Sequence, residues 1–313
     1  MDYTNLGRTG LRVSVMGLGA GGHSRLGQSY GNTEAESEEV VRRALELGVN
    51  FFDTAEAYDT EEILGRGLRG VTRDKVVIST KKSTWGDDGP PRAGEIAPAL
   101  EASLRRLDTD YVDVYHLHGL SRDRYDYAMA ELVPELERLR EQGKIRFLGV
   151  TEAFASDPGH EMLQRAVEDS CWDVMMVGFN LLNQSARDRV FTMTRQKDIG
   201  VLIMFAVRRA LSNPEVLAEV MASLRERGKL GSDIAADTDP LPSLVRDDGA
   251  ESLQDAAYRF CRYEPGVHVV LSGTGKVAHL EANAASLDRP PLPDADVARV
   301  KEMFASVDDL SGN

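Results

Sequence analysis

The chain has 313 residues and a formal net charge of −14, with 42% hydrophobic and 28% charged residues, an ordinary composition for a folded globular protein. The negative charge argues against nucleic-acid and anionic-membrane partners, and no run approaches the roughly 18 apolar residues of a membrane span. The N-terminal "MDYTNLGRTG" lacks the basic and apolar regions of a secretory signal. Its two cysteines form no disulfide framework and no metal spacing, so we expect a cytoplasmic protein.

Short apolar runs alternate along the chain with segments of helical periodicity. Most runs are rich in Val, Ile or Phe, and each has only four or five residues, which predicts buried strands. The runs are residues 13–16, 49–52, 76–79, 112–115, 147–150, 174–177, 201–204 and 267–271. Between them, apolar stripes such as Ile96, Leu100, Leu104 and Leu107 predict helices.

Eight such strand–helix units in about 300 residues predict an α/β fold of the closed (β/α)₈ or TIM-barrel class, as a single domain over residues 1–313. An open doubly wound sheet is the structural alternative. Before the first barrel strand, "YTNLGRTGLRV" predicts a β-hairpin. After the seventh, the polar residues 228–251 predict a long loop.

Gly17, Gly19 and Gly22 have the G-x-G-x-x-G spacing of a dinucleotide-binding turn. That turn requires the next helix to begin inside the glycine run, so that its N-terminus meets the pyrophosphate. Here ten residues separate the run from the helix cap at Thr33. The spacing therefore does not predict a Rossmann unit, and we expect these glycines to allow a close backbone approach at the mouth of the first strand.

Chemically active side chains follow three successive predicted strands. Asp53 ends the second predicted strand, and Tyr58 lies in the loop after it. Lys81 ends the third strand, and His116 and His118 end the fourth. Because the site of a (β/α)₈ barrel lies at the carboxyl ends of its strands, we expect them to meet at one rim. His116 is expected to be structural. An H-x-H metal pair, as in a metal-dependent hydrolase, is an alternative that lacks further ligands in a recognisable pattern.

Motifs along nearly the whole chain resemble those of the aldo-keto reductase superfamily. They are "LGRTGLRVS…GLG", "GVNFFDTAEAY", "VVISTKK", "DYVDVYHLHG", "GKIRFLGVT" and "VLSGTGKVAHLEANAASL". The resemblance implies a NADP(H)-dependent oxidoreductase that reduces a small aldehyde or ketone to an alcohol, and a catalytic tetrad of Asp53, Tyr58, Lys81 and His118. An ammonium beside the phenol would lower its pKa, so we expect Lys81 to tune Tyr58 as the general acid. Asp53 would hold Lys81, and His118 would orient the carbonyl oxygen.

The resemblance also implies a cofactor site along the same rim. Its residues would be Gly19, Ala20, Gly21, Asp53, Thr151, Glu152, Met176, Met204, Phe205, Ala206, Ser272, Gly273, Thr274, Lys276, His279 and Asn283. The loop of Gly273, Thr274 and Lys276 precedes a predicted helix, where free N–H groups and the helix dipole favour phosphate. Lys276 favours NADP, with NAD possible.

The nicotinamide end departs from the family pattern. Thr151 and Glu152 stand where the family commonly has Ser-Asn, Met176 where it has Gln, and Met204 where it has an aromatic ring. These changes would weaken binding by about ten- to a hundredfold without abolishing it. They leave open a non-redox sensor or scaffold that binds a nucleotide on the same fold. His23, Tyr30, Trp85, Tyr125 and the 228–251 loop are expected to line the substrate pocket, and neither the substrate nor the oligomeric state follows from the sequence.

Overall fold

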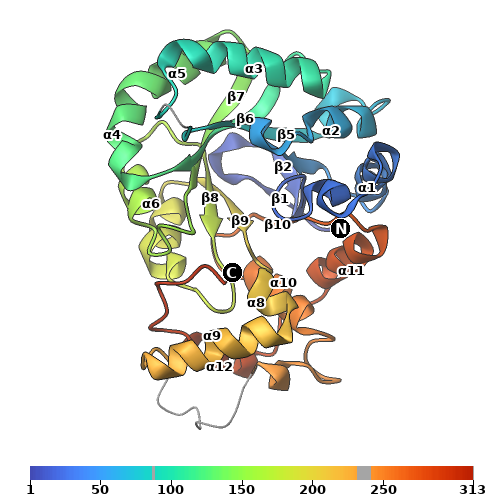
Figure 1. Cartoon of the computed structure of the whole chain (residues 1–313), viewed down its shortest axis with the longest axis vertical. Coiled ribbons are helices and arrows are strands. Elements are labelled where there is room, and N and C mark those ends of the chain that lie inside the picture. The colour runs from blue at the N-terminus through green and yellow to red at the C-terminus, as the bar shows by residue number, and fades with distance from the viewer. Residues whose placement is uncertain (87–88, 231–240, 313) are drawn as a thin grey trace.

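A closed barrel of eight parallel strands forms the centre of the computed structural model, which describes residues 1–86, 89–230 and 241–312 (Figure 1). In order around the barrel, the strands are β3 (Met16–Gly19), β4 (Phe51–Asp53), β5 (Val77–Ser83), β6 (Val112–Leu120), β7 (Ile145–Glu152), β8 (Val174–Gly178), β9 (Gly200–Met204) and β10 (Val269–Ser272). β10 pairs with both β9 and β3, which closes the barrel. This confirms the predicted (β/α)₈ fold and excludes the open sheet.

Helices surround the barrel and connect its strands. They are α1 (Glu34–Glu46), α2 (Glu61–Gly67), α3 (Ala93–Leu107), α4 (Tyr125–Tyr127), α5 (Val133–Glu141), α6 (Glu161–Ala166), α7 (Thr192–Gln196), α8 (Arg209–Ser212), α9 (Pro214–Glu226), α10 (Leu253–Arg262), α11 (Val277–Asp288) and α12 (Asp294–Met303). The predicted capping box begins α1, where Thr33 and Glu36 bond each other's backbone N–H groups. Among the described residues, no helix is long and apolar enough to cross a membrane.

The predicted hairpin is present as β1 (Tyr3–Asn5) and β2 (Arg12–Ser14), and it closes the N-terminal end of the barrel. Leu6, Leu11 and Val13 insert from the hairpin into the apolar interior of the barrel. The predicted first barrel strand, residues 13–16, is wrong in position: it overlaps the hairpin, and the barrel strand runs over the glycine-rich β3. Glycine has a low strand propensity, so the more apolar residues before it gave the stronger signal.

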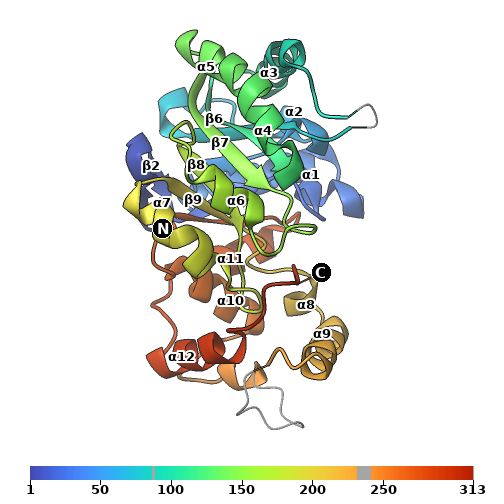
Figure 2. The ribbon, with the colours of Figure 1, turned by 90° about the vertical axis from the view of Figure 1, so that its left-hand side faces the viewer.

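The segment after β9, the seventh barrel strand, is more ordered than predicted. α8 and α9 follow β9 directly, so the predicted loop 228–251 begins after α9. Residues 231–240 of that loop lie outside the described part of the chain. Residues 242–244 form a 3₁₀ turn. In Figures 1 and 2, α8, α9, α10 and α12 gather at one end of the molecule, and the C-terminus returns to lie beside α8, where Ala210 donates a backbone hydrogen bond to Gly312.

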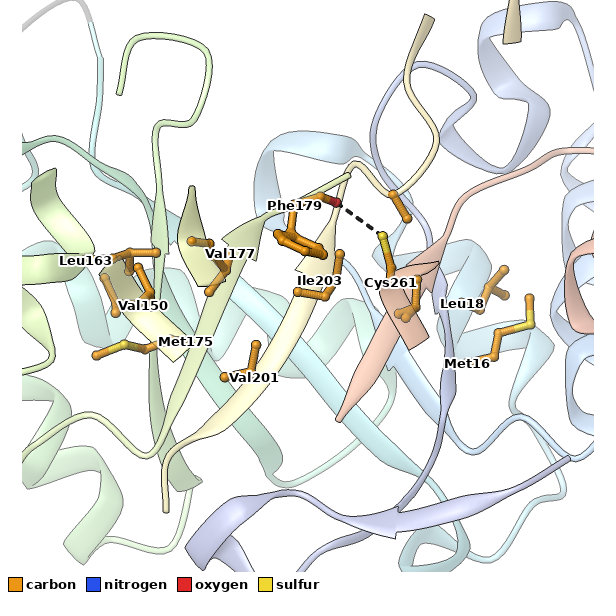
Figure 3. Packing of buried hydrophobic residues seen from close by; sticks show 14 of the residues in the cluster. Met16, Leu18, Val150, Leu163, Met175, Val177, Phe179, Val201, Ile203 and Cys261 are labelled. Atoms are coloured by element: carbon orange, nitrogen blue, oxygen red, sulfur yellow. Dashed lines mark hydrogen bonds between the residues drawn. The ribbon is translucent and has the colours of Figure 1, made fainter. Parts of the chain in front are cut away.

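Two apolar clusters hold the barrel together. The inner cluster fills the barrel with side chains such as Phe51, Val114 and Leu202. The outer cluster packs the other face of the strands against the helices, and Figure 3 shows part of it around Phe179 and Cys261, whose thiol contacts the Phe179 carbonyl at 3.5 Å. The strands are thus buried on both faces, as in other parallel sheets, and their carboxyl ends form a rigid rim.

Candidate active site

Asp53, Lys81, Tyr58 and His118 meet at the carboxyl-terminal rim of the barrel, on the side formed by β4, β5 and β6. Asp53 ends β4, and Tyr58 lies in the 3₁₀ turn that follows. Lys81 and His118 lie on β5 and β6. The parallel pairing of these three strands brings residues far apart in the sequence to the same height on the rim.

Lys81 and Asp53 form a fully buried ion pair below the rim. The Lys81 ammonium donates to Asp53 Oδ2 and to the Thr54 carbonyl, each at 2.6 Å. Ser79 donates to the other carboxylate oxygen at 2.8 Å. Burial raises the pKa of Asp53 and lowers the pKa of Lys81, while the attraction between the two groups opposes both shifts. Such a pair is held in place because either partner alone would be an uncompensated buried charge.

Tyr58 places its hydroxyl oxygen 3.1 Å from Nε2 of His118. Lys81 Nζ lies 5.2 Å from the centre of the Tyr58 ring and donates hydrogen bonds to Asp53 and to the Thr54 carbonyl. Burial, and secondarily the Asp53 carboxylate, raise the pKa of Tyr58 above its usual value. The expectation that Lys81 lowers the pKa of Tyr58 is therefore wrong for this structure, because burial and the Asp53 carboxylate raise this pKa and the Lys81 ammonium is bonded to Asp53.

The loop after β3 holds Tyr58 from two sides. A Cβ on Gly21 would lie 2.2 Å from Cε2 of Tyr58, so only glycine allows the ring to pack there. Arg25 donates to the Tyr58 carbonyl at 2.8 Å and pairs with Asp59 at 3.1 Å. A close approach was expected at Gly17, Gly19 and Gly22. An added Cβ would be crowded at Gly17, by Leu271 at 2.7 Å, but not at Gly19 or Gly22, and the contact with Tyr58 is made by Gly21 instead. Arg25 was not predicted, because its partners are a backbone atom and a distant loop.

His118 is flanked by Trp85, whose ring centre lies 4.6 Å away. Gly119 has a positive φ of 60°, and a Cβ there would approach Trp85 to 2.6 Å, so this glycine lets the indole lie beside the imidazole. Burial lowers the pKa of His118 well below its usual value, with a smaller effect of Lys81. His118 is therefore a neutral imidazole, suited to hydrogen bonding with an uncharged oxygen.

His116 is completely buried in the barrel, and burial lowers its pKa well below the usual value. Within the described residues, no group of three or more His, Cys, Asp or Glu side chains could hold a metal ion. Tyr125 is also buried and bonds Asp169 and Trp172, so the expectation that it lines the pocket is wrong. Trp85 and Tyr30 remain partly exposed at the rim.

The opposite side of the rim, formed by β7, β8 and β9, is mainly apolar. Met176 and Met204 are buried in the inner cluster, and Phe205 packs against it. Thr151 accepts a hydrogen bond from the Gly119 N–H at 2.7 Å. Glu152, expected to accept a hydrogen bond from a cofactor amide, instead bonds His160 and the N–H of Gly178. Its side chain is buried by these partners and is not directed at an open ligand site.

The predicted phosphate loop leads into α11. Lys276, the N-cap of this helix, makes no side-chain cap, and the first turn has no acidic residue, so its N–H groups suit an anion. Gly273, Lys276 and His279 are exposed, whereas Thr274 is buried. The side chains of Ser272 and Asn283 bond each other at 2.9 Å.

The loop after β3 also touches this phosphate loop. A Cβ on Gly275 would lie 2.2 Å from the Cα of Gly27, and Asn32 donates to the Gly275 carbonyl at 2.7 Å. Of the other expected cofactor residues, Ala20 and Ala206 are buried and Gly19 is partly exposed. One short segment, residues 21–32, therefore contacts both Tyr58 and the phosphate loop.

The chain is similar in sequence to several known proteins. The chain is 38% identical over 157 residues to L-galactose dehydrogenase of Arabidopsis thaliana, an alignment that covers 48% of each protein. It is 29% identical over 328 residues to a probable voltage-gated potassium channel subunit beta of Oryza sativa subsp. japonica, covering 95% of this chain and 94% of that protein.

Solved structures with the same fold include the holo form of aldo-keto reductase AKR11C1 from Bacillus halodurans, with a TM-score of 0.75, 23% identity and full coverage of both chains. A Klebsiella pneumoniae aldo/keto reductase in complex with NADP and acetate has a TM-score of 0.71 and 22% identity, and covers 96% of this chain and 95% of that one. The sequence model of the Aldo/keto reductase family matches residues 16–305. The chain therefore belongs to the aldo/keto reductase family of oxidoreductases.

Proposed function

We propose that the protein is a NADP(H)-dependent oxidoreductase that interconverts a small aldehyde or ketone and its alcohol, with Tyr58 as the general acid. The observation that carries this proposal is the contact between the Tyr58 hydroxyl and His118 Nε2, 3.1 Å apart and next to the buried Lys81–Asp53 pair. A carbonyl oxygen placed within hydrogen-bond reach of both side chains, beside their contact, would accept a hydrogen bond from the phenol.

A nicotinamide cofactor held at this rim would supply the hydride that the carbonyl carbon needs in the reductive direction, and the residues of this chain would handle the proton. The oxygen takes the proton of Tyr58, which leaves an alcohol and a phenolate. The Lys81 ammonium, 5.2 Å from the centre of the Tyr58 ring, would offset only part of the cost of the buried phenolate, because burial and Asp53 oppose that charge. His118, neutral by burial, orients the oxygen without competing for the proton.

The phosphate loop supports the cofactor assignment. The uncapped N-terminus of α11 suits a phosphate group, and the exposed Lys276 beside it favours NADP over NAD. NADP is bound in the Klebsiella pneumoniae structure of the same fold. Because the chain resembles L-galactose dehydrogenase over half its length, the first compounds to assay are aldoses in the oxidative direction and simple aldehydes in the reductive direction.

The test combines binding with turnover. We expect NADPH to bind more tightly than NADH by calorimetry, and at least one compound of the panel to be turned over. Tyr58→Phe should bind NADPH normally and lose about 10²- to 10⁴-fold in kcat, the usual contribution of a general acid. Tyr263→Phe removes a hydroxyl that bonds the Arg289 carbonyl on the surface and serves as the control. Failure to bind NADPH, or unchanged kcat in Tyr58→Phe, would overturn the proposal.

A second candidate is a nucleotide-binding sensor or scaffold without turnover. It is favoured by the similarity to a probable potassium channel subunit beta over nearly the whole chain and by the altered side chains at the ends of β7, β8 and β9. NADPH binding with no oxidation across the panel, by the wild type as well as Tyr58→Phe, would favour this candidate.

A further inference from the structure

Arg25 holds the stretch of backbone that carries Tyr58. Its Nε donates to the Tyr58 carbonyl at 2.8 Å, and its Nη2 pairs with Asp59 Oδ2 at 3.1 Å. Both partners lie at the end of the 3₁₀ turn Glu56–Tyr58, and Asp59 leaves that turn with a positive φ of 54°. The guanidinium therefore fixes the main chain directly beside the side chain of the proposed general acid.

The backbone of Arg25 is itself strained. Arg25 and Leu26 have positive φ values of 46° and 56°, and Gly27 follows at 92°. A non-glycine residue enters this region only at a cost in conformational energy, and such residues are concentrated where the strain serves a function. Leu26 is completely buried in the outer cluster, and its carbonyl accepts a hydrogen bond from the Ser37 hydroxyl at 2.7 Å. The surrounding contacts thus maintain a bend that the residues would not favour by themselves.

The other side of this bend lies on the phosphate loop. A Cβ on Gly275 would lie 2.2 Å from the Cα of Gly27 and 3.0 Å from the carbonyl carbon of Leu26, so the two backbones are in direct contact. Asn32 donates from its side chain to the Gly275 carbonyl at 2.7 Å and from its N–H to the Gly27 carbonyl at 3.1 Å. A shift of residues 272–276 would therefore move the two residues that follow Arg25.

These contacts form one continuous path through the segment 21–32. It runs from Gly275 to Gly27 and Leu26 by backbone contact, and from Arg25 to the Tyr58 carbonyl by a hydrogen bond. Energetic coupling between separate sites is carried by contiguous packing and hydrogen bonds around an element with two arrangements. The bend is such an element, because residues released from a positive φ relax to the commoner negative region.

We propose that Arg25 is a positioning residue for Tyr58, and that the segment 21–32 transmits occupation of the phosphate loop to the position of this phenol. The inference rests on the proposed function, because it requires a cofactor phosphate at the loop and Tyr58 as the acid. An anion bound at residues 272–276 would stabilise that loop, and with it the bend in which Arg25 bonds the Tyr58 carbonyl. The acid would then be in place when the phosphate end of the cofactor is bound.

The first test asks whether Tyr58 responds to a ligand that is too short to reach it. Adenosine 2′,5′-bisphosphate carries the phosphate end of NADP and has no nicotinamide. In protein with 3-fluorotyrosine in place of Tyr58, we expect this compound to shift the fluorine NMR resonance. In the same protein carrying Arg25→Ala, we expect the compound to bind with a Kd within about threefold, measured by calorimetry, and to cause no shift.

The outcomes of this test are distinct. Binding without a shift, or an equal shift in the presence of Arg25→Ala, would overturn this inference and leave the proposed function intact. Absence of bisphosphate binding would also overturn it, and the proposed function would fall with it if NADPH does not bind either.

Kinetics test the role of Arg25 itself. Arg25→Ala should lower kcat by about ten- to a hundredfold, since a misplacement of about 1 Å can cost that much. It should change the Kd of NADPH by less than about threefold. Arg25→Lys keeps a cationic donor for the Tyr58 carbonyl and should recover most of the lost kcat.

Arg8→Ala is the matched control. The Arg8 side chain is 33% exposed, against 38% for Arg25, and it likewise bonds an aspartate and backbone carbonyls, but it lies in the hairpin at the opposite end of the barrel. Both urea midpoints should stay close to that of the wild type, because both ion pairs are partly exposed. An unchanged kcat in Arg25→Ala, or an equal loss of kcat in Arg8→Ala, would contradict the positioning role.

Discussion

The two sides of the barrel rim are built on different principles. On the β4–β6 side, Asp53, Lys81, Tyr58 and His118 are connected by hydrogen bonds and ring contacts with atoms placed within a few ångströms. On the β7–β9 side, rings and thioethers make apolar packing contacts, and the Glu152 carboxyl group bonds His160 and the Gly178 N–H. Proton transfer requires particular atoms in hydrogen-bond reach, whereas a planar ring can be held by many alternative surfaces. The first side therefore follows the family's residue pattern, and the second does not.

The largest effect should come from breaking the buried pair of the first side. Lys81→Met leaves the Asp53 carboxylate buried without a partner, which we expect to lower the free energy of unfolding by about 3–5 kcal/mol and to abolish turnover. Because an unpaired buried carboxyl has a raised pKa, the loss should be larger at pH 8 than at pH 5. Urea unfolding at both pH values measures it.

Its matched control is the next residue along the strand. Lys82 is only half-buried and pairs with Glu56 at 2.8 Å. Lys82→Met should cost less than about 1 kcal/mol. An equal loss of unfolding free energy in Lys81→Met and Lys82→Met would show that the buried pair has no special role in stability. Recovery of activity in the double variant Asp53→Asn/Lys81→Met would show that it has none in turnover.

Gly21→Ala should displace Tyr58, the proposed general acid, and leave the β7–β9 side of the rim unchanged. The added methyl would meet the Tyr58 ring at 2.2 Å, so the ring must move. A misplacement of about 1 Å can reduce turnover by about a hundredfold, and we expect kcat to fall to this extent while the Kd of NADPH changes little. At the adjacent Gly22, an added Cβ would meet no other heavy atom, but the residue has a positive φ. Gly22→Ala therefore measures the effect of backbone strain in this loop without a clash with Tyr58. An unchanged kcat in Gly21→Ala would mean that the position of Tyr58 is not limiting.

Gly178→Ala makes the reciprocal change on the β7–β9 side. Its methyl would meet Phe154 at 2.3 Å, and overpacking of this kind costs about 1–3 kcal/mol of stability. We expect the Kd of NADPH to rise by about tenfold, with a smaller change in kcat for saturated enzyme. Calorimetry and steady-state kinetics separate the two. A loss in kcat as large as that of Gly21→Ala would show that the two sides do not act independently.

The smallest expected effect is that of alkaline pH on reduction. Burial raises the pKa of Tyr58 above its usual value of about 10, so the phenol keeps its proton as the pH rises through neutrality. The kcat for reduction should therefore not fall through deprotonation of Tyr58 below about pH 10. An inflection near pH 7 to 8 assigned to Tyr58, and absent in Tyr58→Phe, would show that Lys81 lowers this pKa after all.

The sequence was sufficient to place the barrel and to bring the four tetrad residues to one rim, because strand spacing and the polar ends of strands are local patterns. The sequence did not show which side chains contact each other, because those contacts depend on the direction in which each side chain points. Burial of Tyr58, and secondarily the Asp53 carboxylate, reverse the pKa shift expected for Tyr58. The partner of Glu152, His160, lies in a loop without a motif. Phe154 and Phe205, which stack on each other, gave no signal in the sequence, since an apolar residue near a strand end is equally compatible with ordinary packing.

The contact of Gly27 with Gly275 has a practical consequence for redesign. The backbones of two loops that are far apart in the sequence touch here with no side chain between them. We therefore expect that neither loop can be replaced by that of a relative unless the other is replaced with it. A change of cofactor preference would best be sought at the exposed Lys276, with both glycines retained. Grafts of new substrate specificity would need to transplant residues 21–32 and 272–276 as one cassette.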